Sequence, residues 1–189
     1  MYTAQWDSTT SIQSLRNPYN TELTIGTNFL ANTPLTNLIT DTHFAQRDRM
    51  GRLVAFVDRI VADSWASIAD DRDRDPSKRN CSNPKYGGRG IGVDEATALL
   101  IEEDMSVSIT SWTNEGAAYL LCLDHSPRTC EPDRDLEVSN IAVTRLSGNT
   151  TAAFNLQNWK VLNKAATASY SLSAANGRLI SSQKGGNVY

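Results

Sequence analysis

The feature that most constrains the fold is a short apolar run followed closely by an amphipathic helix pattern. Residues 35–40 are predicted to form a buried strand that ends at Asp41. Asp48 is placed to cap the helix that follows. Apolar residues then recur at the i, i+3, i+4 and i+7 spacing of one helix face: Leu53, Phe56, Val57, Ile60, Val61 and Ile68. A buried strand that leads into such a helix, with more strands after it, indicates an α/β fold.

From residue 90 onward the pattern favours strands, which predicts a β-rich C-terminal half. Residues 97–101 and 105–110 are predicted to pair as a hairpin around an acidic turn at 102–104. Four other segments have the composition of strands: 23–25, 117–123, 141–146 and 170–172.

A run of alternating charges separates the helix from these strands. It includes residues 70–79, and Pro76 is predicted to end the helix. We interpret residues 70–89 as a surface insertion in a single domain that spans 1–189. The glycines at 87–92 lack both the dinucleotide spacing and the Lys-Ser/Thr of a phosphate loop. They are expected to give backbone freedom or close packing, and no cofactor is predicted.

The charge balance excludes two kinds of partner. Eighteen Lys and Arg stand against 21 Asp and Glu, which gives a net charge of −3. Proteins that bind nucleic acid or anionic membranes normally carry a basic excess, so neither partner is expected. No apolar run approaches the roughly 20 residues of a membrane-spanning helix.

The three cysteines do not suggest a metal centre. Cys122, His125 and Cys130 are close in sequence, but a structural zinc site needs four ligands, so no metal is predicted. Two interpretations stay open for Cys81, Cys122 and Cys130: they are loop cysteines, or Cys122 and Cys130 form a disulfide.

Two sequence patterns bear on localisation. Asn80 and Asn149 each begin an Asn-X-Ser/Thr pattern, which favours a secreted, extracellular protein. The first residues lack the basic and apolar regions of a signal peptide.

The segment 40–52 carries the first set of candidate functional residues. His43 follows the predicted strand directly, at the place where reacting groups gather in open α/β sheets. Imidazole can take up and return a proton near neutral pH. Three arginines follow, and their guanidinium groups match the geometry of a carboxylate ligand: Arg47, Arg49 and Arg52. Asp41 and Asp48 offset part of this charge. The same residues equally fit an interpretation without function, in which the acid caps the helix, the histidine is packed and the arginines are solvated.

The second candidate segment is 90–99, in which Glu95 follows a short apolar strand. A carboxylate there can reach a histidine at a neighbouring strand end, fix its tautomer and stabilise the imidazolium. The other interpretation is an acid that caps a turn or pairs with arginine. We therefore expect His43 and Glu95 to meet at one edge of the sheet.

Together the two segments resemble the cyanophycinase group of serine peptidases. The resemblance rests on DTHFAQRDRMGR at 41–52 and GIGVDEATA at 90–98, and it extends loosely over most of the chain. It implies part of a three-layer α/β/α sandwich of the class I glutaminase type. It also implies hydrolysis of β-aspartyl or isoaspartyl bonds by a Ser-His-Glu triad, with His43 as general base and Glu95 as its partner.

The same resemblance implies which residues bind the substrate, a peptide that carries a carboxylate. Asp41, Thr42 and the three arginines would line the pocket. Thr42 stands where members that degrade cyanophycin usually have Gln, which points to another β-aspartyl substrate.

The chain lacks the glycine-flanked serine of this family, which lies upstream of the matching part. Three explanations stay open: a truncated chain, a first half supplied separately, or a non-catalytic binding or assembly relative. The isolated chain is predicted to be inactive. An unpaired sheet edge would favour aggregation, a homodimer or association with the missing N-terminal half. A glutaminase is disfavoured because Cys81 lies in a loop without an elbow.

Overall fold

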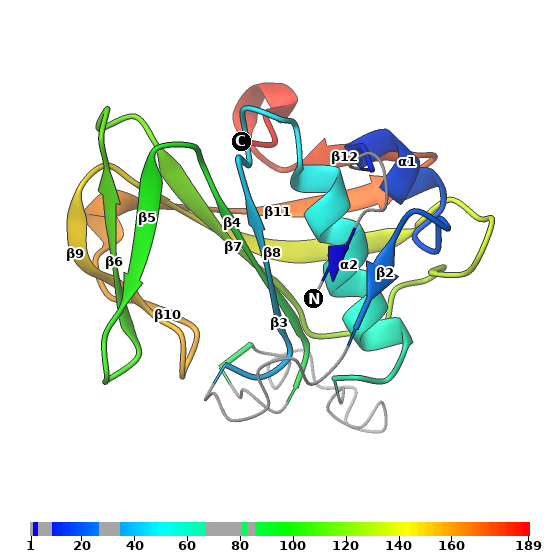
Figure 1. The fold of residues 1–189 in the computed structure, drawn as a ribbon, viewed down its shortest axis with the longest axis horizontal. Helices are drawn as coiled ribbons and strands as arrows, with labels where there is room; N and C mark the ends of the chain where they lie inside the picture. The colour runs from blue at the N-terminus through cyan, green and yellow to red at the C-terminus, as the bar shows by residue number, and fades with distance from the viewer. Residues whose placement is uncertain (1, 4–8, 27–34, 67–80, 83–85) are drawn as a thin grey trace.

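The computed structural model describes residues 2–3, 9–26, 35–66, 81–82 and 86–189 (Figure 1). Ile68, Pro76 and Asn80 lie outside the described residues, as does most of the predicted insertion at 70–89. The last two residues of that range belong to a buried strand, so the insertion as drawn from the sequence ends too late.

A six-stranded sheet forms the centre of the molecule, in the order β12-β11-β8-β7-β4-β3. Its strands are β3 (Leu38–Thr42), β4 (Gly88–Val93), β7 (Ala117–Leu123), β8 (Val138–Ser147), β11 (Thr167–Ala175) and β12 (Arg178–Ser181). Among the described strands of this sheet, β3 and β4 are parallel and every other neighbouring pair is antiparallel. The β3–α2–β4 order confirms the α/β unit predicted from the sequence.

Two helices cover one face of this sheet (Figure 1). α2 (Met50–Ala62) packs on β3, β4 and β7, and α1 (Ser11–Arg16) packs on α2. The helix ends at Ala62 and not at Pro76. Asp48 does not cap it, because Arg49 occupies the N-cap position, without a side-chain hydrogen bond that caps the helix, and Asp48 accepts a hydrogen bond from the hydroxyl of Tyr189.

Glycines on β4 let α2 approach the sheet closely. A Cβ atom on Gly88 would lie 2.4 Å from the carbonyl oxygen of Val57, and one on Gly90 would lie 2.8 Å from the side chain of Val57. Real Cβ atoms do not tolerate such contacts, so close packing explains these two glycines.

A four-stranded antiparallel sheet covers the other face, in the order β10-β9-β6-β5. Its strands are β5 (Thr97–Ile101), β6 (Ser106–Ser111), β9 (Thr150–Asn155) and β10 (Lys160–Val161). Ile91, Leu120 and Phe154 belong to the core between the two sheets. The described fold is therefore mixed α/β and rich in sheet, with strands where a three-layer α/β/α sandwich would have helices.

The remaining elements are short. β1 (Tyr2–Thr3) and β2 (Thr24–Ile25) form a two-stranded ribbon, and two 3-10 turns, η2 (Lys164–Ala166) and η3 (Lys184–Gly186), lie near the C-terminus. No helix of the described residues has both the length and the apolar character needed to span a membrane.

The cysteines pair differently from the sequence interpretation. Cys81 and Cys122 form a disulfide with their Cα atoms 6.2 Å apart, and Cys130 is free. The predicted Cys122–Cys130 disulfide is therefore wrong. Cys122 lies on β7, which pairs with β4, and the segment before β4 carries Cys81.

Candidate functional site

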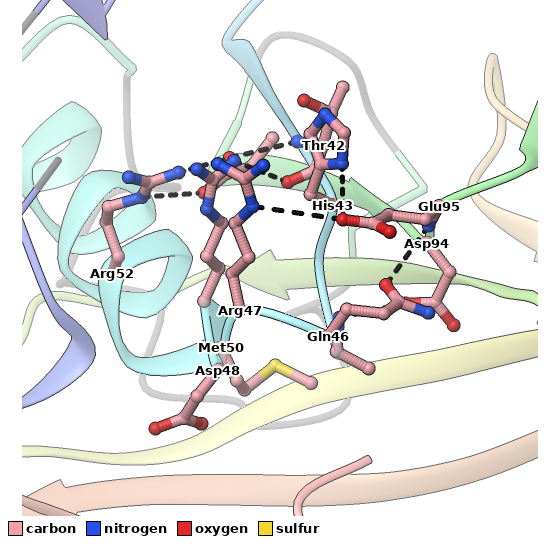
Figure 2. Close-up of polar contacts among 12 residues, drawn as sticks. Thr42, His43, Gln46, Arg47, Asp48, Met50, Arg52, Asp94 and Glu95 are labelled. Carbon is pink, nitrogen blue, oxygen red and sulfur yellow. Dashed lines mark hydrogen bonds and ion pairs between the residues drawn. The ribbon is translucent and has the colours of Figure 1, made fainter.

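The two candidate segments meet at the edge of the sheet where β3 and β4 end. Thr42 pairs with Val93 across the parallel strands, so the residues that follow each strand emerge side by side. The β3–α2 connection then carries His43, and the β4–β5 turn carries Glu95. Figure 2 shows the side chains of both residues pointing toward each other.

His43 and Glu95 form a close polar pair. The Nδ1 atom of His43 lies 2.7 Å from Oε1 of Glu95, which confirms the geometric prediction that they meet. The two side chains are 46% and 44% exposed. A carboxylate accepts a hydrogen bond from Nδ1–H, which leaves the lone pair of a neutral ring on Nε2. No hydrogen bond joins Nε2 to any residue in the described part of the chain.

The other histidine has a different environment. His125 has Nδ1 3.0 Å from the Asp124 carboxylate and Nε2 2.8 Å from the carbonyl oxygen of Ser139. A carbonyl can only accept, so Nε2 of His125 carries a hydrogen and offers no lone pair. The two histidines thus differ in the one property that a general base requires.

Asp94 holds the backbone on both sides of this pair. It is 7% exposed, and its Oδ1 accepts from the backbone N–H of Ala45 at 2.9 Å. Its Oδ2 accepts from the N–H of Ala117 at 3.0 Å, at the start of β7. Asp94 therefore joins the His43 connection, the β4–β5 turn and a central strand. The sequence interpretation missed this role, although the Asp-Glu pair after a strand was a signal for it.

Gln46 adds a second tie that the sequence did not reveal. Its side-chain Oε1 accepts from the backbone N–H of Glu95 at 3.0 Å (Figure 2). Residues of the β3–α2 connection thus bind Glu95 twice, His43 at its carboxylate and Gln46 at its backbone N–H.

Several residues of the site have unfavourable backbone conformations, one of them in the His43–Glu95 pair and one next to it. His43 has φ 50° and Ala96 has φ 52°, both in the left-handed region that non-glycine residues avoid. Such conformations cost on the order of 1–3 kcal/mol, and they collect at sites where side-chain direction matters. Here they direct His43 and the residue after Glu95.

Asp41 and Arg52 form a buried ion pair. Arg52 donates from Nε to Oδ2 at 2.9 Å and from a terminal nitrogen to Oδ1 at 2.5 Å. Their side chains are 6% and 2% exposed. The pair lies inside the protein and fixes the end of β3 against α2, so neither side chain is exposed to a ligand. That both line a substrate pocket stays a prediction.

The other two arginines differ in accessibility. Arg49 is 12% exposed and donates to the Thr42 carbonyl oxygen at 2.6 Å, with Asp41 Oδ1 at 3.3 Å. Arg47 is 56% exposed, and its Nε lies 3.8 Å from Oε1 of Glu95. Arg47 and the exposed Thr42 are therefore the predicted substrate-binding residues that an outside ligand can reach.

An aromatic cluster that includes Phe44 anchors the β3–α2 connection. The ring centroid of Phe44 lies 5.3 Å from that of Tyr119 and 6.0 Å from that of Tyr189. The Tyr189 hydroxyl donates to Oδ1 of Asp48 and accepts from the backbone N–H of Met50. Burial raises the pKa of Tyr189, so its hydroxyl keeps its proton and both hydrogen bonds.

The side chains of this site can support acid–base chemistry. In the described part of the chain no group of three His, Cys, Asp or Glu side chains is arranged to hold a metal ion. No hydroxyl or thiol of these residues is hydrogen-bonded to the His43 ring. Burial raises the pKa of the Cys130 thiol to about 12, so that cysteine is a poor nucleophile.

Comparisons with protein-family models, with curated proteins and with solved structures find no match to this chain.

Proposed function

We propose that this chain carries the general base and the orienting acid of a serine-type peptidase that hydrolyses β-aspartyl or isoaspartyl bonds. His43 is the general base, and Glu95 is the acid that orients its ring. The observation that best supports this is the 2.7 Å His43–Glu95 contact at a solvent-accessible sheet edge. A carboxylate on one ring nitrogen and a lone pair on the other is the arrangement that acyl transfer uses.

The reaction proceeds in two halves. A serine hydroxyl attacks the carbonyl carbon while its proton moves to Nε2 of His43, and Glu95 stabilises the imidazolium. The imidazolium returns the proton to the leaving amine as the carbon–nitrogen bond breaks. Water then attacks the acyl-enzyme, again with His43 as base, and releases the acid and the serine.

The nucleophile in this proposal comes from a segment outside this chain, as the resemblance to cyanophycinases implies. β3 is the last strand of the central sheet among the described residues, and it runs parallel to β4. Further parallel strands with their helices would extend the sheet at β3, while the four-stranded sheet keeps the place that the second helix layer has in a glutaminase-like sandwich. The serine and the oxyanion donors would then lie beside Nε2 of His43.

Arg47 is the residue that selects a carboxylate on the substrate. It is the exposed arginine next to the His43–Glu95 pair, whereas Arg52 is committed to Asp41. A guanidinium binds a carboxylate through two parallel hydrogen bonds. Thr42 beside it is shorter than Gln, which favours a β-aspartyl peptide other than cyanophycin.

The test is hydrolysis of β-aspartyl dipeptides by this chain expressed together with the segment encoded upstream of it. His43→Ala should lower kcat by about 10²–10⁴-fold, because general base catalysis contributes that much. His125→Ala is the matched control and should leave kcat unchanged, since both of its ring nitrogens are already bonded.

Equal activity in His43→Ala and wild type would remove His43 from the mechanism. An upstream segment without a glycine-flanked serine, together with no turnover, would favour the second function, a binding or assembly relative. The isolated chain should show no measurable hydrolysis.

A further inference from the structure

Trp112 is a large apolar side chain that lies almost wholly in solvent. It follows β6 on the turn to β7 and is 92% exposed, more than any other large apolar side chain of the described residues. Aromatic rings carry a large apolar surface and are normally at least partly buried. A single exposed apolar side chain is common on protein surfaces. What bears on function here is its position, since the Trp112 backbone is hydrogen-bonded to Ala96, the residue after Glu95.

Trp112 is one of the residues that line a shallow, open groove with a volume of about 570 Å³. The lining residues are Ala96, Thr97, Ala98, Thr110, Ser111 and Trp112. None of them is charged, and the ring and methyl groups provide apolar surface. A groove of this composition favours an uncharged apolar group over an ionic one.

Hydrogen bonds connect this groove to the His43–Glu95 pair. The backbone N–H of Trp112 donates to the Ala96 carbonyl oxygen at 3.0 Å. The Thr97 hydroxyl donates to the Glu95 carbonyl oxygen, also at 3.0 Å. The groove therefore starts at the residue after Glu95, Ala96, whose backbone is left-handed.

We propose that this groove is a subsite for an apolar, preferentially aromatic, side chain of the peptide residue next to the scissile bond. That side chain stacks on the indole of Trp112 and covers the methyl groups of Ala96 and Ala98. Arg47 binds the carboxylate of the substrate, so the two contacts together would favour β-aspartyl peptides with an apolar neighbour. The assignment to a scissile bond rests on the function proposed above, but binding to the groove does not.

Binding is tested on the chain as it stands, by NMR with two probes. N-acetyl-L-phenylalaninamide carries an aromatic side chain, and N-acetylglycinamide is the same compound without it. We expect the first probe to shift the indole N–H resonance of Trp112 and the second to leave it in place. The resonance is assigned by its absence in Trp112→Ala.

Affinity in the variants is followed through the amide resonances of Ala98 and Thr110. Trp112→Ala should weaken binding of the phenylalanine probe about tenfold, because the stacking surface is lost. Ile180→Ala removes another exposed apolar side chain, 60% exposed, and should change nothing. Ala98→Gln fills the groove from an exposed position and gives a second variant if Trp112→Ala fails to fold.

Three results would overturn the subsite: no shift with the phenylalanine probe, equal shifts with both probes, or full affinity in Trp112→Ala and Ala98→Gln. The function itself is separated by His43→Ala, which should bind the probe as wild type does. With the assembled protein, Trp112→Ala should reduce the preference for β-aspartyl-phenylalanine over β-aspartyl-glycine about tenfold. Probe binding without any turnover would refute the proposed function and leave the groove as a binding site.

Discussion

Asp58 lies in the middle of α2 with no exposed surface, and neither of its carboxylate oxygens has a hydrogen-bond partner among the residues that the structure describes. Burial raises the pKa of Asp58 well above its usual range, which favours the neutral acid. The folded state therefore holds this proton to a higher pH than the unfolded state does. Stability should decrease as pH rises above the unfolded-state value of about 3.9 and toward the folded-state pKa.

The variant Asp58→Asn tests this residue directly, since it keeps the shape and removes the ionisation. At pH 7 it should be more stable than wild type by on the order of 1–3 kcal/mol, and near pH 3 the two should be similar. Urea denaturation at both pH values measures the difference. Parallel pH dependences in the two proteins would show that Asp58 does not titrate as its burial implies.

The arginines allow a matched comparison between a buried and an exposed residue. Arg52→Met leaves Asp41 buried with a reduced set of partners, and it should lower the free energy of unfolding by about 3–5 kcal/mol. Arg47→Met removes an exposed guanidinium and should change stability by no more than about 0.5 kcal/mol. Chemical denaturation compares them, and similar losses would contradict the assignment of Arg52 to the interior.

At the scale of elements, the sequence predicted those with strong local signals. The 3.6-residue apolar spacing placed α2, and two strand-like runs on either side of the acidic turn at 102–104 placed the β5–β6 hairpin, which the observed pairing confirms. β9 was missed because it is short and partly polar and is defined by pairing with the distant strand β6. β12 was missed although it forms a hairpin with β11 across Asn176-Gly177, a local turn signal that the sequence interpretation overlooked. Predicted β3 began three residues too early, since pairing with β4 decides where it starts.

The candidate site was predictable only in part for the same reason. His43 and Glu95 could be linked because each follows an apolar strand. The burial of Asp41 with Arg52 depends on how α2 lies against β3, which spacing alone does not specify. The contacts of Asp94 and Gln46 likewise exist only once two connections lie side by side.

Asp94 provides the test at this scale, because it ties three elements together. Asp94→Ala removes two hydrogen bonds from a buried carboxylate and should lower the free energy of unfolding by on the order of 3 kcal/mol. Glu103→Ala, at an exposed position on the β5–β6 turn, is the control and should have little effect. A loss in Asp94→Ala no larger than in the control would contradict the bridging role.

Across the whole molecule, the central sheet carries one core on each face, and the disulfide joins the segment before β4 to β7. Removing the bond by the double change Cys81→Ala and Cys122→Ala should lower the free energy of unfolding by about 2–4 kcal/mol, as for other loops of this length. Thiol counting by mass spectrometry in denaturant without reductant should find one free cysteine, Cys130. Three free thiols would contradict the pairing.

The His43–Glu95 relay is tested most directly by the ring nitrogen chemical shifts of the two histidines. In neutral His43 the proton should reside on Nδ1, because Glu95 accepts from it, and Nε2 should show the shift of an unprotonated nitrogen. Glu95→Ala should abolish this preference, whereas His125 should remain protonated on Nε2 in both proteins. A proton on Nε2 of His43, or a His43 spectrum unchanged by Glu95→Ala, would contradict the account.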